Sequence, residues 1–139
     1  MESWYRQFLA GTAAAIFIVT PLELLLLDHT GSIVQFAPFI ACAAGLTAAV
    51  LAFRGPRSNS VAQVCRWIAY AIILVSMYGM LEHVLHNLEL EREVRPDAPT
   101  GTMLWQSIFG AAPLLASGIL SLGALLIWAS LKQPVSRPT

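Results

Sequence analysis

The sequence predicts an all-α integral membrane protein built as a four-helix bundle. Of its 139 residues, 57% are hydrophobic and only 12% are charged, about half the charged fraction of an ordinary soluble domain. Four apolar segments follow one another, each close to or above the ~20 residues that cross ~30 Å of hydrocarbon. Barrel-type alternation of polar and apolar residues is absent. Helices are therefore expected, because each satisfies its own backbone hydrogen bonds in lipid.

The expected spans cover residues 8–27, 33–53, 64–87 and 103–131, within a single domain of residues 1–139. The first is too long for a signal-peptide core, and no small-residue cleavage site follows it. The third is expected to continue as a helix into the loop of residues 88–102, whose leading Glu and Arg residues suit a helix. Pro96 and Pro99 should end that continuation. Proline within or beside the other spans can kink them, at Pro21, Pro38 and Pro113.

The charges are distributed unequally between the two ends of this bundle. An even number of spans places both termini on one side. Six of the eight basic residues lie there: Arg6, Arg54, Arg57, Arg66, Lys132 and Arg137. Seven of the eight acids lie on the other side: Glu23, Asp28, Glu82, Glu89, Glu91, Glu93 and Asp97. The positive-inside rule therefore predicts cytoplasmic termini in a multi-pass cell membrane protein, with a bacterial inner membrane as the expected location.

An internal repeat of two helical hairpins is one interpretation of the pattern. Pro21-Leu22-Glu23 aligns with Met80-Leu81-Glu82, and Thr30-Gly31-Ser32 aligns with Thr100-Gly101-Thr102. Two spans in each half would make the repeats parallel, related by an axis along the membrane normal. The spacing between matches drifts, so chance similarity between apolar segments is the alternative.

Ionisable residues near the outer ends of the spans are the candidate functional site. Glu23 lies in the first apolar segment and Glu82 in the third, followed by His83, His86 and Asn87. Such residues are rare within membrane spans and commonly mark functional sites. Helical spacing places Glu82 and His86 on one face. The bundle is expected to gather these groups with others at one depth below the outer surface: Glu23, Gln35, Glu82, His83, His86 and Gln106.

Carboxylates with imidazoles predict a transition-metal site, with Fe, Cu, Zn and Mn all compatible. The predicted ligands are Glu23, Glu82, His83, His86 and His29, and Gln106 or Asn87 could orient an imidazole. Fe or Cu would allow redox chemistry. The paired Glu-x-x-His motifs of ferritin-like proteins and the His-Glu-x-x-His motif of zinc proteases are absent. Haem between His29 and a histidine of the third span fits less well, because Glu23 and Glu82 would adjoin the porphyrin.

Three further interpretations stay open. The histidines and Asn87 could be ordinary residues of the membrane–water interface. Glu23 and Glu82 could form the proton or substrate site of a small oligomeric transporter. The chain could also be a non-catalytic accessory subunit of a larger membrane complex. The pattern therefore leaves enzymatic activity undecided, and it predicts the lipid bilayer and either further copies or a partner subunit as binding partners. Nucleic acid is not expected, since the basic turn at residues 54–57 suits topology and anionic lipid.

Overall fold

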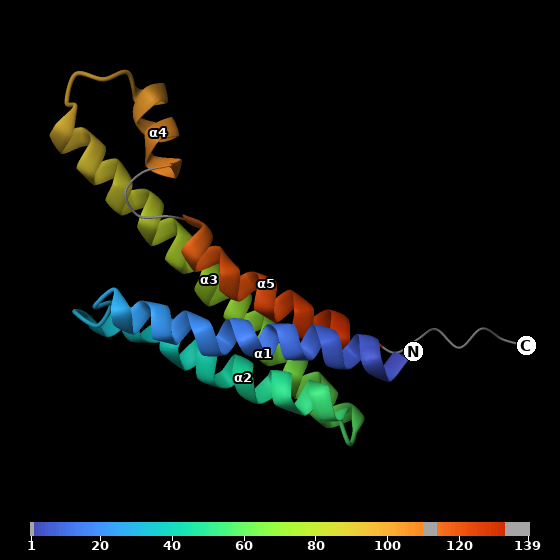
Figure 1. Cartoon of the computed structure of the whole chain (residues 1–139). Helices are drawn as coiled ribbons and strands as arrows, with labels where there is room; N and C mark the ends of the chain where they lie inside the picture. Colours follow the sequence, from blue (N-terminus) through green and yellow to red (C-terminus); the bar gives the residue numbers. More distant parts are fainter. Residues whose placement is uncertain (1, 110–113, 133–139) are drawn as a thin grey trace, which may run out of the picture.

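The computed structural model describes residues 2–109 and 114–132, and these are helices joined by turns, without a strand. The helices are α1 (Glu2–Leu26), the short 3-10 helix η1 (Ile33–Phe36), α2 (Ala37–Arg54), α3 (Asn59–Val94), α4 (Thr100–Ile108) and α5 (Leu114–Ser130). Figure 1 shows α1 and α2 running side by side as a hairpin, while α3 extends well past their ends and carries α4. The all-helical prediction is confirmed.

Three helices are long and apolar enough to cross a membrane. They cover Ser3–Leu26, Ile33–Arg54 and Asn59–Val94, and the described part of α5 contributes a shorter apolar helix at Gly118–Ser130. These segments agree with the first three predicted spans to within a few residues, except that α3 is longer. The membrane-protein prediction is thus supported by helix length and composition.

Small residues allow α1, α2, α3 and α5 to pack closely. The helix α1 lies against both α2 and α5, and α3 lies against both α5 and α2. The buried face of α2 is made of small side chains, at Ala41, Cys42, Gly45, Ala48, Ala49 and Ala52. Phe17 of α1 fills the space that these residues leave and is 1% exposed. A Cβ added to Gly45 of α2 would lie 2.6 Å from the Phe17 ring, and a Cβ added to Gly123 of α5 would lie 2.8 Å from it.

The range predicted as a fourth span, 103–131, is divided between two helices. The helix α4 ends at Ile108, and α5 begins at Leu114. A proline lacks the N–H that a continuous helix would direct to the carbonyl four residues earlier. For Pro113, which lies outside the described residues, that carbonyl belongs to Phe109. The sequence prediction treated this proline as a kink within one span.

The third predicted span, 64–87, belongs to a longer helix. Helix α3 begins at Asn59, where the Ser58 Oγ accepts a hydrogen bond from the Val61 N–H at 3.3 Å. It ends at Val94, just before Pro96, which confirms the predicted helical continuation into the loop. Helix α4 then folds back onto the distal part of α3.

Candidate functional site

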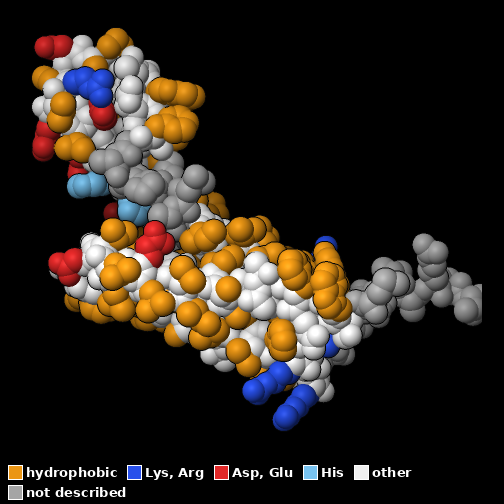
Figure 2. Space-filling model, in the orientation of Figure 1, with side chains coloured by type: hydrophobic (Ala, Val, Ile, Leu, Met, Phe, Trp, Pro, Cys, Tyr) orange, Lys and Arg blue, Asp and Glu red, His pale blue; other side chains and the backbone are white. Residues whose placement is uncertain are grey.

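The two ends of the molecule differ in charge as the sequence predicts. Figure 2 shows hydrophobic side chains along the packed helices and a group of Lys and Arg side chains at the end where α1 begins and α5 ends. Most Asp and Glu side chains, and the His side chains, lie around the opposite end and on the α3–α4 hairpin. The candidate site is at this acidic end.

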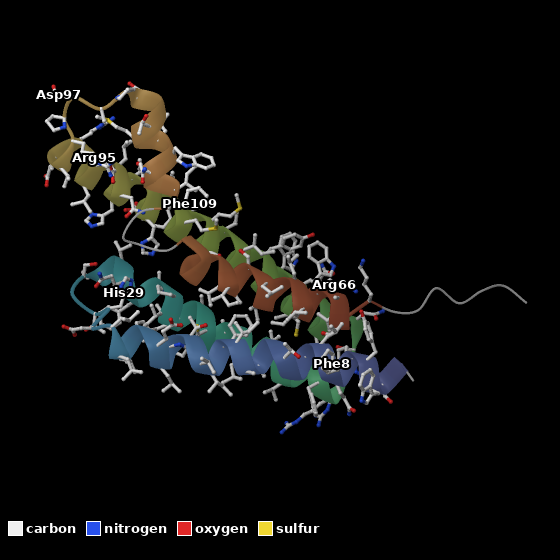
Figure 3. All side chains as sticks on the ribbon, turned by 45° about the horizontal axis from the view of Figure 1, so that its top comes forward. Phe8, His29, Arg66, Arg95, Asp97 and Phe109 are labelled. Atoms are coloured by element: carbon white, nitrogen blue, oxygen red, sulfur yellow. The ribbon has the colours of Figure 1, made fainter. Side chains whose placement is uncertain are left out.

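A backbone motif at the end of α1 places His29. Asp28 has φ 51°, which is the left-handed region. The His29 N–H donates to the Leu24 carbonyl at 2.9 Å, and the Asp28 N–H donates to the Leu25 carbonyl at 3.2 Å. This pair of bonds is a Schellman motif, which satisfies helix-end carbonyls and reverses the chain. It holds half-buried His29 at the tip of the α1–α2 hairpin (Figure 3).

The three histidines all lie at this end, His29 just after α1 and His83 and His86 on α3. Burial is the main influence on the imidazole of His83, and His29, His86 and Glu82 are the neighbouring ionisable groups that add smaller electrostatic effects. His83 is half-buried, whereas Glu82 and His86 are exposed. Groups from the ends of α1 and α3, which are far apart in the sequence, therefore lie at the same end of the molecule.

Tyr78 adds a polar group that the sequence analysis did not single out. Its hydroxyl interacts with the carboxylate of Glu82, one helical turn further along α3. The i to i+4 spacing that pairs Glu82 with His86 would also have identified Tyr78. The carboxylate of Glu82 thus has a phenol hydroxyl as a polar neighbour on its own helix.

The residues predicted to surround this group take different roles. The Gln35 Oε1 accepts a hydrogen bond from the Ser32 N–H at 3.1 Å, at the start of η1. Buried Asn87 donates from Nδ2 to the Ser107 carbonyl of α4 at 2.9 Å. Gln106, on the same short helix as Ser107, is half-buried. Gln35 therefore stabilises the start of η1, and Asn87 joins α3 to α4.

Glu23 lies in separate surroundings from Glu82. It lines an apolar groove of about 440 Å³ along one face of α1. The remaining lining residues are Thr12, Ala15, Ile16, Val19, Thr20 and, from α5, Ile119. The two carboxylates that the sequence places at equivalent positions thus have different neighbours.

The predicted metal ligands are not close enough together to bind one ion. Within the described residues, no three His, Cys, Asp or Glu side chains are grouped so that they could hold a metal ion. Glu23, His29, Glu82, His83 and His86 all belong to the described part of the chain. Binding by His29, Glu82, His83 and His86 would require their side chains to converge from the positions seen here.

Comparison of the chain with protein-family models, with curated proteins and with solved structures finds no match.

Proposed function

We propose that the chain crosses the cell membrane four times as a bundle of α1, α2, α3 and α5, with both termini in the cytoplasm. The spacing of charges along the helices supports this. Arg6 and Glu23 are separated by about 26 Å of α1, and Arg66 and Glu82 by about 24 Å of α3, at 1.5 Å per residue. Neither intervening segment contains a charged residue. Both lengths approach the ~30 Å of a hydrocarbon core.

This placement sets the depth of the candidate site. Glu23 and Glu82 lie near the outer boundary of the hydrocarbon, and the rest of distal α3 lies beyond it. A bacterial inner membrane gives the basic end the cytoplasmic side and the acidic end the periplasmic side. His29, His83 and His86 are then accessible from outside the cell membrane.

We propose further that this outer end binds a transition-metal ion. The observation that carries the proposal is that all three histidines lie at the acidic end of the molecule, His29 just after α1 and His83 and His86 on α3. Imidazole and carboxylate together suit Zn, Fe, Mn or Cu. The exposed side chains of Glu82 and His86 are free to rotate toward His83, and Tyr78 can orient the Glu82 carboxylate. Glu23 is a candidate ligand only if it leaves the α1–α5 groove.

Metal titration of the purified protein in detergent tests this proposal. We expect about one equivalent of Zn²⁺ or Co²⁺ to bind, and Co²⁺ to develop visible absorption bands of nitrogen and oxygen ligation. Replacing His83 or His29 with Ala should weaken binding by at least about 10-fold, the loss typical of even an outer-sphere partner. Elemental analysis of the protein as isolated identifies the native metal.

Glu93→Gln is the matched control, because Glu93 is an exposed carboxylate of the same helix beyond the site. It should bind metal as the wild type does. Equal, substoichiometric binding by the wild type, His83→Ala, His29→Ala and Glu93→Gln would contradict a metal site.

A further inference from the structure

The end of the molecule opposite the His and Glu residues contains a cavity lined by cationic side chains. Its volume is about 470 Å³. The cations come from four separate segments: Arg6 of α1, Arg57 of the α2–α3 turn, Arg66 of α3, and Lys132 just after α5. No Asp or Glu is among the described residues that line it. Figure 3 shows Arg66 at this end.

Two of these guanidinium groups are incompletely satisfied. The Nε atoms of Arg6 and Arg66 are buried and have no hydrogen-bond partner among the described residues. Arg66 uses Nη2 to donate to the Leu131 carbonyl at 3.2 Å, at the C-terminal end of α5. A buried donor without an acceptor costs about 1–3 kcal/mol. Two of the cations that line the cavity therefore each keep a buried donor for which the described part of the chain supplies no acceptor.

The first turn of α3 contributes to the same lining. Ser58, Asn59 and Ala62 line the cavity beside the cations. A helix N-terminus presents free N–H groups and the positive end of the helix dipole, both of which favour an anion. The 36-residue α3 thus adds to a potential that is already positive.

In the membrane placement proposed above, on which this step rests, an aromatic cluster puts the cavity at the depth of lipid headgroups. The Tyr70 ring lies 5.7 Å from Trp67 and 4.5 Å from Trp128, centroid to centroid. Trp67 of this cluster follows Arg66 directly in α3. Trp and Tyr are enriched at membrane–water interfaces, where their rings meet both lipid and water. A cavity at this level is accessible to phosphate groups of lipids and to solutes.

We propose that this cavity is a binding site for a phosphate-bearing anion. The four cations would neutralise the anion, and guanidinium groups bind phosphate oxygens through two parallel N–H donors. Because the Nε–H groups have no exposed surface, Arg6 and Arg66 would rotate to present them. Basic cavities between membrane helices are suited to anionic lipid headgroups, and a soluble phosphate ester offers the same chemistry. The site is independent of the proposed metal site at the opposite end.

Binding experiments on the full chain in a zwitterionic detergent distinguish these sources. One arm adds short-chain phosphatidylglycerol, with phosphatidylcholine as its neutral control. The other arm adds inorganic phosphate, with chloride at equal ionic strength as its control. Thermal stability and tryptophan fluorescence report binding, and native mass spectrometry counts retained lipid. Saturable binding of phosphatidylglycerol alone supports a lipid site, and saturable binding of inorganic phosphate supports a site for soluble phosphate compounds.

Substitutions then assign the site to the cavity. Arg66→Gln should weaken the saturable binding by about 10-fold or more, equivalent to about 1.4 kcal/mol. Arg57→Gln serves where Arg66→Gln fails to fold, since Arg57 is an exposed residue of the turn. Arg92→Gln, an exposed arginine near the far end of α3, should bind as the wild type does. Absence of saturable binding in both arms, or equal binding by Arg57→Gln, Arg66→Gln and Arg92→Gln, would overturn the proposal.

Discussion

Asn87 is a buried polar residue that joins α4 to the distal part of α3. It is 1% exposed, and its amide donates to the Ser107 carbonyl within the last turn of α4. The final four carbonyls of a helix have no partner within that helix. Asn87 therefore serves as a tertiary cap that holds α4 against α3. The adjacent Ser107 Oγ donates to the Met103 carbonyl at 2.7 Å, which keeps the hydroxyl satisfied in the same contact.

Replacing Asn87 with Ala should release α4 without unfolding the packed part of α3. The Ser107 carbonyl would lose its donor, at a cost of about 1–3 kcal/mol. Amide hydrogen exchange of residues 100–108 should accelerate, while exchange near Ile72 should stay unchanged. Thr102→Ala, a change at an exposed position of α4, should leave exchange as in the wild type. Uniform acceleration throughout α3 and α4 would contradict a local role for Asn87.

At the scale of helices, Phe17 is the wedge that organises three of them. Its ring extends from α1 between Gly45 of α2 and Gly123 of α5. At both positions, any side chain larger than that of glycine would collide with the Phe17 ring. In a membrane, helix association depends on such close packing of small residues, since lipid is as apolar as the side chains themselves. The space around Phe17 thus determines how closely α1, α2 and α5 approach.

Gly45→Ala should destabilise the packed helices. A Cβ there would stand 2.6 Å from the Phe17 ring, so the ring must move, and overpacking of this kind costs about 1–3 kcal/mol. That cost exceeds the gain in helix propensity of at most about 1 kcal/mol. The thermal unfolding temperature in detergent should therefore fall. Adding Phe17→Leu to Gly45→Ala should recover part of the loss, which a double-mutant cycle would measure.

Gly101→Ala is the control for this experiment. Gly101 lies in α4, and a Cβ at this position would meet nothing within 4 Å. It should leave stability unchanged or raise it through helix propensity alone. If Gly45→Ala and Gly101→Ala unfold at the same temperature, the wedge is not a determinant of stability.

Local sequence signals predicted the helices better than they predicted the site. Apolar length indicated four spans, and the first three correspond to helices long and apolar enough to cross a membrane. The Glu/Arg composition before Pro96 indicated the long α3. The C-terminal end of α1 was predicted to within one residue, because the expected first span ends at residue 27 and α1 ends at Leu26. The left-handed conformation of Asp28 was not predicted, because glycine usually occupies that position. Spacing along one helix could place Glu82 beside His86. It could not show that Asn87 contacts α4 and that Glu23 faces a groove beside α5, because those depend on the approach of other helices.

At the scale of the whole molecule, α3 is longer than a membrane crossing requires. Its 36 residues span about 54 Å, so about 24 Å extends beyond a ~30 Å hydrocarbon core. Helix α4 packs against this extension and buries Met103 and Ser107, while it leaves Trp105 63% exposed and Phe109 68% exposed. Their rings lie 5.0 Å apart. In the proposed topology, this exposed aromatic pair would belong to the interfacial belt at the outer boundary.

The proposed topology predicts which ends of the molecule react with a membrane-impermeant maleimide. The labelling chain carries Cys42→Ala and Cys65→Ala, which remove both buried native thiols. In intact cells, Asp97→Cys should react, because Asp97 is exposed in the turn between α3 and α4. Ser60→Cys, exposed near the basic end, should react only after the membrane is opened.

Leu74→Cys provides the control for burial in lipid. Leu74 is exposed on the surface of α3, midway between Arg66 and Glu82, so hydrocarbon should shield its thiol on both sides of the membrane. It should stay unlabelled before and after the membrane is opened, and react once detergent or denaturant replaces the lipid. Reaction of Ser60→Cys in intact cells, with Asp97→Cys protected, would reverse the orientation. His29, His83 and His86 would then face the cytoplasm, because they share the acidic end with Asp97.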